Sequence, residues 1–210
     1  MPTITVYGTP ISTYVRTVRL LLEEAGVEYT LNSVDIFNGE TKSADYLAKH
    51  PFGKVPTVDV GGNMIYETAA IVSYLDAAVM NGRFSPVDPL VRARMQQIMA
   101  IVDSYLYAPA IQTVVIQRLI VPSQGGETDE AAVEAAVAPL KTALEAIEAL
   151  AVSNPYLLGG EISLADFHLI PIFVYLSKTP EFETAIAQSP KLQSWWSTAQ
   201  ALATVKLVCS

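Results

Sequence analysis

The chain has 210 residues, of which 51% are apolar and only 16% charged, with a mean hydropathy of +0.33. This composition excludes an intrinsically disordered chain and suffices for one large domain or two small domains with real cores. The 13 Lys and Arg against 21 Asp and Glu give a net charge of −8, which has the wrong sign for a general nucleic-acid or anionic-membrane binder.

The first 80 residues alternate strand and helix patterns. A β-rich run ends at Gly8, and apolar residues then recur at helical spacing until Gly26 stops them. Further along, Gly61–Asn63 is a hairpin signal between two short strand patterns. The expected elements, in chain order, are strand 3–7, a helix up to 25, strand 29–34, helix 42–49, strand 57–60, strand 64–66 and helix 68–79.

The pattern beyond residue 88 is entirely helical. The segment 85–89 contains two prolines and separates it from the first part. A long helix is expected over 90–121 with a kink at Pro109, followed by helices over 129–151, 164–177, 183–187 and 191–207. The sequence therefore predicts an α/β domain over 1–80, a linker over 81–88 and an all-helical domain over 89–210.

Cysteine and histidine usage limits the chemistry further. Cys209 is the only cysteine, so no intramolecular disulfide or CxxC pair can form. His50 and His168 are the only histidines, and we expect no metal site.

The longest apolar run, 169–176, is far short of the roughly 20 residues of a membrane helix, and the N-terminus has no leader pattern. We expect a cytoplasmic protein that binds neither membrane nor nucleic acid.

The first candidate site is the turn Gly8–Thr13. It joins a strand end to a helix N-terminus, which is where ligands bind in open α/β sheets and where free N–H groups favour an anion such as a thiolate. Ser12 or Thr13 would supply a hydroxyl. The alternative interpretation is that one of them only caps the helix.

Two further candidates lie at the ends of the next strands. If the Val55–Pro56 bond is cis, the Val55 backbone is expected to be free to receive an extended peptide; the alternative is an ordinary trans proline. Glu67 and Thr68 stand between a strand and a helix, where a carboxylate and a hydroxyl suit the ammonium and carboxylate of an amino acid, unless Thr68 is only a helix cap. Ser163 and Asp166 have capping-box spacing and are interpreted as structural.

With GTPIST, PFGKVPT, Glu67-Thr68 and GGEISLADF in this order along the chain, the sequence resembles the cytosolic glutathione transferases from end to end. The GTPIST turn is most similar to the serine-type branch, as in phi and related bacterial transferases. The resemblance implies a thioredoxin-like domain followed by an all-α domain, glutathione as co-substrate, conjugation of its thiolate to small hydrophobic electrophiles, and a role in detoxification.

The resemblance also implies residue roles. Ser12 would stabilise the thiolate, with Tyr7 as the alternative from tyrosine-type relatives. The usual His-Lys pair is Thr41-Lys42 here, which removes one expected ligand. The glutathione-binding set would be Lys42, Lys54, Val55, Pro56, Glu67 and Thr68. The electrophile pocket would be built from Ile11, Tyr105, Tyr107, Ile111 and Gln112, unless the aromatic residues among them are ordinary interdomain core.

Other classes stay open at this point. A thiol-disulfide reductase or cysteine-type lyase would want a cysteine beside position 12, where none stands. A non-catalytic glutathione-binding member, or a glutathione-dependent isomerase or dehalogenase, would share the whole site. The resemblance and the apolar composition also predict a homodimer built on the third and fourth helices. Phe52 is expected to pack inside its own chain; the alternative is an aromatic key that inserts into the partner subunit. The residues expected on the shared face are Arg92, Met95, Gln96, Met99 and Asp103.

Overall fold

The computed structural model describes residues 2–210 and divides them into two compact units. The first unit comprises the residues up to Ser85 together with Ala203–Ser210, and the second comprises Pro86–Leu202. The expected split lies close to this one at its first boundary. It differs at the C-terminus, because the last eight residues belong to the first unit.

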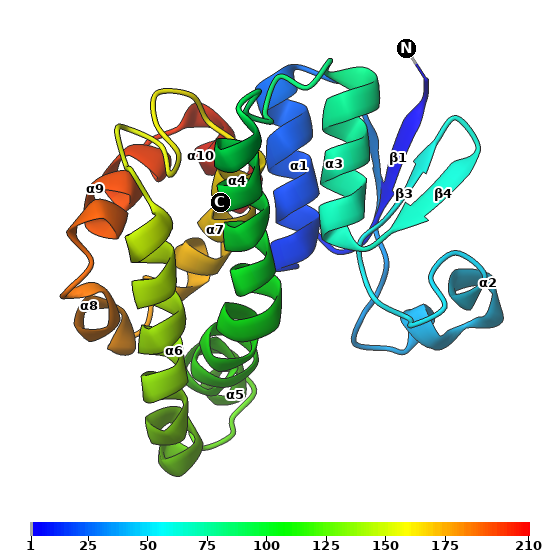
Figure 1. Ribbon diagram of the computed structural model, residues 1–210. Coiled ribbons are helices and arrows are strands. Elements are labelled where there is room, and N and C mark those ends of the chain that lie inside the picture. Colours follow the sequence, from blue (N-terminus) through cyan, green and yellow to red (C-terminus); the bar gives the residue numbers. More distant parts are fainter. Residues whose placement is uncertain (1) are drawn as a thin grey trace. The chain divides into compact units, whose positions relative to one another are not determined.

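The first unit has a four-stranded mixed sheet of order β2-β1-β3-β4 (Figure 1). Strand β1 runs parallel to β2 and antiparallel to β3, and β3 runs antiparallel to β4. The strands are β1 (Ile4–Tyr7), β2 (Thr30–Asn32), β3 (Thr57–Val60) and β4 (Asn63–Tyr66), and the helices are α1 (Thr13–Ala25), η1 (Glu40–Lys42), α2 (Ala44–Leu47), α3 (Thr68–Val79) and α10 (Ala203–Cys209).

The core of this unit follows from alternation in the strands and helical spacing in α1 and α3. Val6 of β1, Val58 of β3, Val18 of α1 and Ile71 of α3 are all fully buried, and α1 packs on α3. Gly26 ends α1 in a left-handed conformation with φ 68°, as glycine allows at a helix C-cap. The expected thioredoxin-like arrangement is therefore confirmed.

The second unit is all-helical among its described residues. Its elements are α4 (Pro89–Ile101), η2 (Val102–Leu106), η3 (Ala108–Ile120), α5 (Val121–Ser123), α6 (Glu130–Leu150), α7 (Leu164–Leu176), α8 (Glu181–Ile186) and α9 (Pro190–Ala199). The expected kink is present: Pro89–Leu106 and Ala108–Ser123 meet at 49°, beside Pro109. The prediction of one continuous helix over 191–207 is wrong, because the chain is not helical between the end of α9 and the start of α10.

Helix α10 returns to the first unit and packs on α1. Val205 and Val208 are buried there, and the Thr204 hydroxyl donates to Glu24 Oε2 at 2.8 Å. These contacts explain why the last residues leave the helical unit.

No single helix among residues 2–210 is both long and apolar enough to cross a membrane. One bent pair, Pro89–Leu106 with Ala108–Ser123, passes that test by length and composition only.

Candidate functional site

Strand register brings the predicted site segments to one edge of the first unit's sheet. Tyr7, the last residue of β1, pairs with Thr57, the first residue of β3, and Thr57 pairs with Tyr66, the last residue of β4. The turn after Tyr7 carries Ser12, the turn before Thr57 carries Val55, and the residue after Tyr66 is Glu67. Three separate stretches of sequence therefore meet along this edge.

Ser12 is the N-cap of α1. Its Oγ accepts a long hydrogen bond of 3.4 Å from the Val15 N–H, and its own N–H donates to the Thr9 carbonyl at 3.1 Å. Ser12 is half-buried, whereas the neighbouring Thr13 is only 4% exposed. Ser12 is thus the better placed of the two hydroxyls for a ligand, although it also caps the helix.

Gly8 allows α1 to approach the Val55 turn. A Cβ at Gly8 would collide with the Val15 side chain and would lie 3.4 Å from Val55 Cβ. The Gly8 N–H also donates to the Asn32 carbonyl at 3.0 Å, which ties the turn to β2. A residue larger than glycine would push the Ser12 turn away from Val55.

The Val55–Pro56 peptide bond is cis. In the part of the chain that the structure describes, the Val55 backbone makes no hydrogen bond to another backbone group. Pro56 is buried and Val55 is half-buried. An extended peptide can therefore pair with Val55 without displacing a backbone hydrogen bond.

Two side chains that sequence reasoning missed support this turn. The Tyr46 hydroxyl donates to the Lys54 carbonyl at 2.8 Å and lies 3.4 Å from Thr57 Oγ1. The buried His50 ring accepts the Phe52 N–H on Nδ1 at 3.3 Å and packs on Tyr66 with ring centroids 4.9 Å apart. Burial lowers the pKa of His50, and the nearby Glu67 carboxylate opposes that shift. The sequence signal that could have identified these two supporting residues is their position: Tyr46 and His50 are polar aromatic residues just before the Pro51-Phe52-Gly53 break.

Glu67 and Thr68 open α3. Glu67 has a positive φ of 69°, an uncommon conformation for a residue with a side chain, and its carboxylate is exposed. Thr68 is buried, and the structure records no side-chain hydrogen bond capping α3. Thr68 is therefore not the simple N-cap that the alternative interpretation required.

Two exposed lysines stand near this edge. Lys42 ends η1 and Lys54 precedes Val55, and neither lies within ion-pair distance of a carboxylate among residues 2–210. Gly53 allows the segment of Lys54 to approach the segment of Lys42 closely. Its φ is +57°, and a Cβ at this position would lie 2.7 Å from the Thr41 carbonyl oxygen. Both ammonium groups are available to an anionic ligand.

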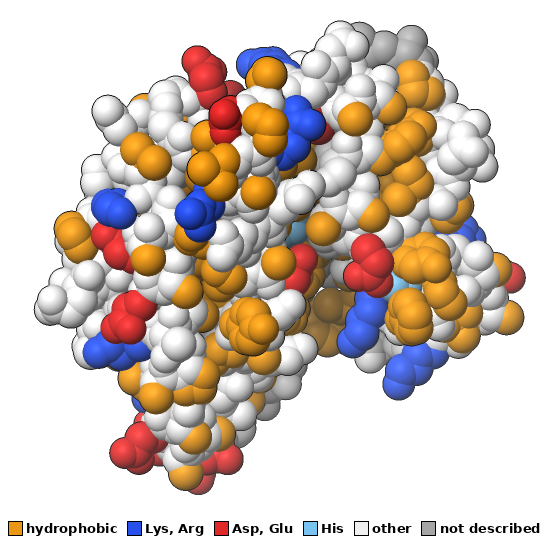
Figure 2. Space-filling model, in the orientation of Figure 1, with side chains coloured by type: hydrophobic (Ala, Val, Ile, Leu, Met, Phe, Trp, Pro, Cys, Tyr) orange, Lys and Arg blue, Asp and Glu red, His pale blue; other side chains and the backbone are white. Residues whose placement is uncertain are grey.

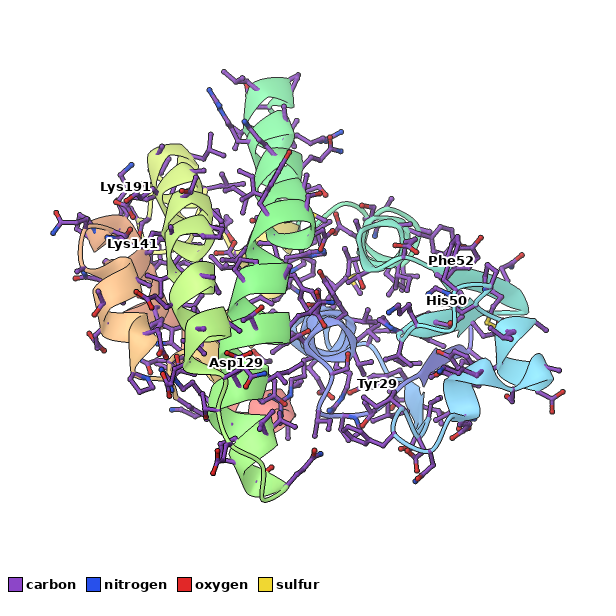
Figure 3. All side chains as sticks on the ribbon, turned by 90° about the horizontal axis from the view of Figure 1, so that it is seen from below. Tyr29, His50, Phe52, Asp129, Lys141 and Lys191 are labelled. Carbon is purple, nitrogen blue, oxygen red and sulfur yellow. The ribbon has the colours of Figure 1, made fainter. Side chains whose placement is uncertain are left out.

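The predicted packing of Phe52 inside its own chain is wrong. Phe52 is 69% exposed, although its ring makes T-shaped contacts with His50 and Tyr66 at centroid distances of 6.1 and 6.4 Å. Figure 3 shows His50 and Phe52 beside each other, and Figure 2 shows hydrophobic side chains gathered near a histidine on this unit.

The predicted electrophile-pocket residues are divided between the units. Ile11 in the first unit is exposed. In the helical unit Tyr105 and Gln112 are exposed, Tyr107 is half-buried and Ile111 is buried. Their pocket stays a prediction.

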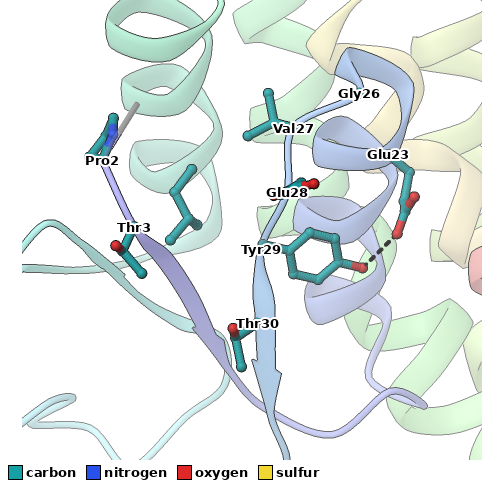
Figure 4. Close-up of a pocket in the computed structure, with 9 residues that line it drawn as sticks. Pro2, Thr3, Glu23, Gly26, Val27, Glu28, Tyr29 and Thr30 are labelled. Atoms are coloured by element: carbon teal, nitrogen blue, oxygen red, sulfur yellow. Dashed lines mark hydrogen bonds between the residues drawn. The ribbon is translucent and has the colours of Figure 1, made fainter.

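A groove of about 1020 Å³ lies elsewhere, at the start of β1 and the turn after α1 (Figure 4). Glu23 and Glu28 line it, and the Tyr29 hydroxyl donates to Glu23 at 2.9 Å while accepting from Arg19 Nε at 3.0 Å. These carboxylates would repel an anionic peptide, so the groove is not the site for one. No group of three or more metal-ligating side chains occurs within residues 2–210.

Comparison with known proteins follows the same two units. The family model for the glutathione S-transferase N-terminal domain matches residues 11–78, and the C-terminal domain model matches residues 95–202. A probable glutathione S-transferase GSTF2 from rice (Oryza sativa subsp. japonica) is 34% identical over 205 residues, covering 97% of this chain and 94% of the rice protein.

Two solved structures are also similar. The crystal structure of glutathione transferase F7 from Populus trichocarpa has a TM-score of 0.84 and 31% identity, covering 98% of this chain and 97% of that one. Glutathione S-transferase I from maize, in complex with an atrazine glutathione conjugate, has a TM-score of 0.83 and 28% identity, covering all of this chain and 97% of the other. The two family models and the end-to-end coverage of these relatives lead to one conclusion: the chain belongs to the glutathione S-transferase family.

Proposed function

We propose that this protein is a glutathione transferase that ionises the thiol of bound glutathione and conjugates it to small apolar electrophiles. The observation that carries the proposal is the Ser12 hydroxyl at the N-terminus of α1, on the same sheet edge as Val55 and Glu67. The maize relative bound to a glutathione conjugate supports the same chemistry.

The site residues have complementary roles in this proposal. The Val55 backbone pairs with the cysteinyl backbone of glutathione beside Pro56. Glu67 and Thr68 hold the ammonium and carboxylate of its γ-glutamyl end, and Lys42 and Lys54 hold its glycine carboxylate. The two free ammonium groups matter because the whole chain carries −8.

Thiol acidity sets the energy that Ser12 must supply. A free thiol has a pKa near 8.5, so only a few per cent is ionised at pH 7. Lowering that pKa by about two units requires about 2.7 kcal/mol. One charge-assisted hydrogen bond of about 1.5 to 3 kcal/mol, with a helix N-terminus worth about 0.3 to 1 kcal/mol, is sufficient. The proposed step therefore needs no general base.

The test is a titration of enzyme-bound thiolate by its ultraviolet absorbance. Ser12→Ala should return the pKa of bound glutathione toward that of the free thiol, whereas Tyr7→Phe should leave it unchanged. An unchanged pKa in the Ser12 variant together with a raised one in the Tyr7 variant would assign the role to Tyr7. Failure of the wild-type protein to bind glutathione would overturn the function itself.

Ile11, Tyr105, Tyr107, Ile111 and Gln112 are the residues that we propose for the electrophile. Turnover of a model aryl halide, followed by isomerase and dehalogenase substrates, separates a transferase from the other glutathione-dependent reactions and from a non-catalytic member. We place the protein in the cytoplasm, where glutathione is kept reduced, and propose a role in detoxification.

We also propose a homodimer. The exposed side chains of α3, which include Ala70, Ser73, Tyr74 and Ala77, carry no charge, and the one charged residue of the helix, Asp76, is buried. A solvated helix face normally carries charged residues, so this face suits a partner. The exposed Phe52 adds an aromatic anchor of the kind that interfaces bury.

The predicted place on the shared dimer face is wrong for two residues. Met95 and Met99 are 2% and 4% exposed, because they form the core of the helical unit, while Arg92, Gln96 and Asp103 are exposed. Sedimentation tests the dimer: a wild-type mass near 22.7 kDa at micromolar concentration would refute it. A dimeric wild type and a monomeric but folded Phe52→Ala variant would identify Phe52 as the anchor.

A further inference from the structure

His50 is a buried histidine that follows α2, and both its backbone and its ring hold the turn before Val55. Its carbonyl accepts the Gly53 N–H at 2.9 Å, and its Nδ1 accepts the Phe52 N–H at 3.3 Å. A ring nitrogen accepts a hydrogen bond only while it carries no proton, so the second contact requires a neutral imidazole with its proton on Nε2. The hold on the turn that presents Val55 therefore depends on the protonation state of His50.

The same ring also contacts the end of β4. It packs on Tyr66 with ring centroids 4.9 Å apart, and Glu67 directly follows Tyr66 in the chain. His50 thus joins the segment that presents Val55 to the segment that presents Glu67, although these two are not neighbours in the sequence. The residue is only 2% exposed, so water screens a charge on its ring poorly.

Charged groups act on the ring from both segments. The titratable side chains near it on other elements are Tyr66 on β4, Glu67 after it and Lys54 in the turn. Burial has the largest effect and lowers the pKa of His50 below its ordinary value of 6.5; Glu67 opposes this shift and Lys54 adds to it. The ring is therefore uncharged at neutral pH, which leaves the Glu67 carboxylate to bind an ammonium. A protonated ring would attract that carboxylate and repel the ammonium.

We propose that His50 is a positioning residue for glutathione: its neutral ring holds the Val55 turn and the end of β4 together, and protonation of the ring weakens binding of the γ-glutamyl ammonium at Glu67. This inference rests on the proposed function, which assigns Val55 to the cysteinyl backbone and Glu67 to the γ-glutamyl end. Because bound glutathione disfavours the protonated ring in return, affinity should fall as the pH falls below 6.5.

The experiment measures the Kd of S-methylglutathione at pH 7 and pH 5 by isothermal titration calorimetry. This probe has no ionisable thiol, and its carboxylates and ammonium change charge little in that range and equally for every variant. For the wild type we expect the Kd to rise at least about threefold from pH 7 to pH 5. For His50→Asn we expect a change of less than about 1.5-fold, since the amide oxygen still accepts the Phe52 N–H but takes up no proton.

His50→Leu removes the acceptor as well as the titrating group. Its Kd at pH 7 should be about fivefold higher than that of the wild type, which is the effect of one lost neutral hydrogen bond, and should change little further at pH 5. His50→Asn should recover most of that loss. Circular dichroism at both pH values checks that each variant is folded, and the comparison of His50→Asn with the wild type decides if His50→Leu does not fold.

His168→Leu is the matched control. His168 is the second histidine of the chain, but it lies in the helical unit, and burial lowers its pKa to about 4, below the range of the experiment. This variant should keep the wild-type pH dependence of the Kd.

The outcomes separate this inference from the proposed function. A wild-type Kd that is the same at pH 7 and pH 5 overturns the inference and leaves the proposed function intact. So does a His50→Asn variant that keeps the full wild-type pH dependence, because another group then titrates. A His50→Leu Kd equal to that of the wild type at pH 7 overturns the positioning role. If wild-type protein does not bind S-methylglutathione at pH 7, the proposed function has failed, and this inference with it.

Discussion

His168 is a buried side chain whose protonation should govern acid stability. It is 1% exposed in α7, and burial lowers its pKa to about 4, against the smaller opposing effect of a hydrogen bond to the Leu164 carbonyl. Asp103 Oδ2 lies 3.9 Å from Nε2 and is itself partly solvated. The imidazole therefore stays neutral in the folded protein at pH values where the unfolded chain is already protonated.

The sign of the effect follows from this difference. As the pH falls from about 6.5 to about 4, the unfolded chain binds a proton at His168 that the folded chain does not, so the free energy of unfolding should fall by about 3 kcal/mol. Above pH 6.5 the residue should contribute no pH dependence. His168→Leu should flatten this part of the stability profile in urea titrations at pH 7 and pH 5. Equal slopes in both proteins would contradict the prediction.

Gly53 is a second residue with a defined role. Its positive φ and the nearby Thr41 carbonyl leave no room for a side chain, so Gly53→Ala must displace the segment of Lys42 or the turn of Lys54. We expect a loss of about 1 to 2 kcal/mol in stability and weaker glutathione binding. Gly125→Ala is the control for a positive φ without a nearby atom: it should cost stability yet leave the Kd for glutathione unchanged.

At the scale of elements, the start of α7 depends on one buried carboxylate. Asp166 accepts hydrogen bonds from the Ser163 N–H and hydroxyl, the Leu157 N–H and the Trp195 indole N–H, at 2.7 to 2.9 Å. Burial raises the pKa of Asp166, and these four donors oppose the shift. The structural interpretation of the Ser163–Asp166 capping box is confirmed.

Removing this carboxylate should be costly. Asp166→Ala leaves four buried donors without their acceptor, and we expect about 3 to 5 kcal/mol of lost stability. Ser163→Ala removes one donor only and should cost about 1 kcal/mol. Urea denaturation of both variants measures the difference. Similar losses in the two variants would show that the cap, rather than the network, sets the stability of this element.

Elements were predictable where local signals agreed with packing. Helix α3 was predicted at its observed bounds of Thr68–Val79, since strand alternation stops where helical spacing begins. The break between α9 and α10 was not predictable, because residues 200–203 contain no Gly or Pro. There the Leu202 N–H closes the helix on the Ala199 carbonyl, and burial of Val205 against α1 turns the chain. Similarly, Ser12 and Val55 carried motif signals, whereas the support that Tyr46 gives to the Val55 turn depends on a contact that only the fold creates.

At the scale of the whole molecule, the two units are linked by the chain twice. The chain enters the helical unit after Ser85 and returns after Leu202 to place α10 on α1, the helix that carries Ser12. The C-terminal residues should therefore stabilise the first unit. A stabilising effect of these residues on the first unit distinguishes the observed division of the chain from the predicted one, in which the helical domain extends to residue 210.

Val208 and Leu207 offer a matched pair for the test. Val208 is 3% exposed on α10, whereas its neighbour Leu207 is 62% exposed. Val208→Ala should lower the free energy of unfolding by about 2 kcal/mol, since it removes buried methyl groups and leaves a cavity, and Leu207→Ala should change it by less than about 0.5 kcal/mol. Hydrogen exchange locates the effect: the amides of α1 should lose protection in Val208→Ala while those of α6 do not. Loss of protection confined to α6 and α7 would instead show that the last helix serves the helical unit.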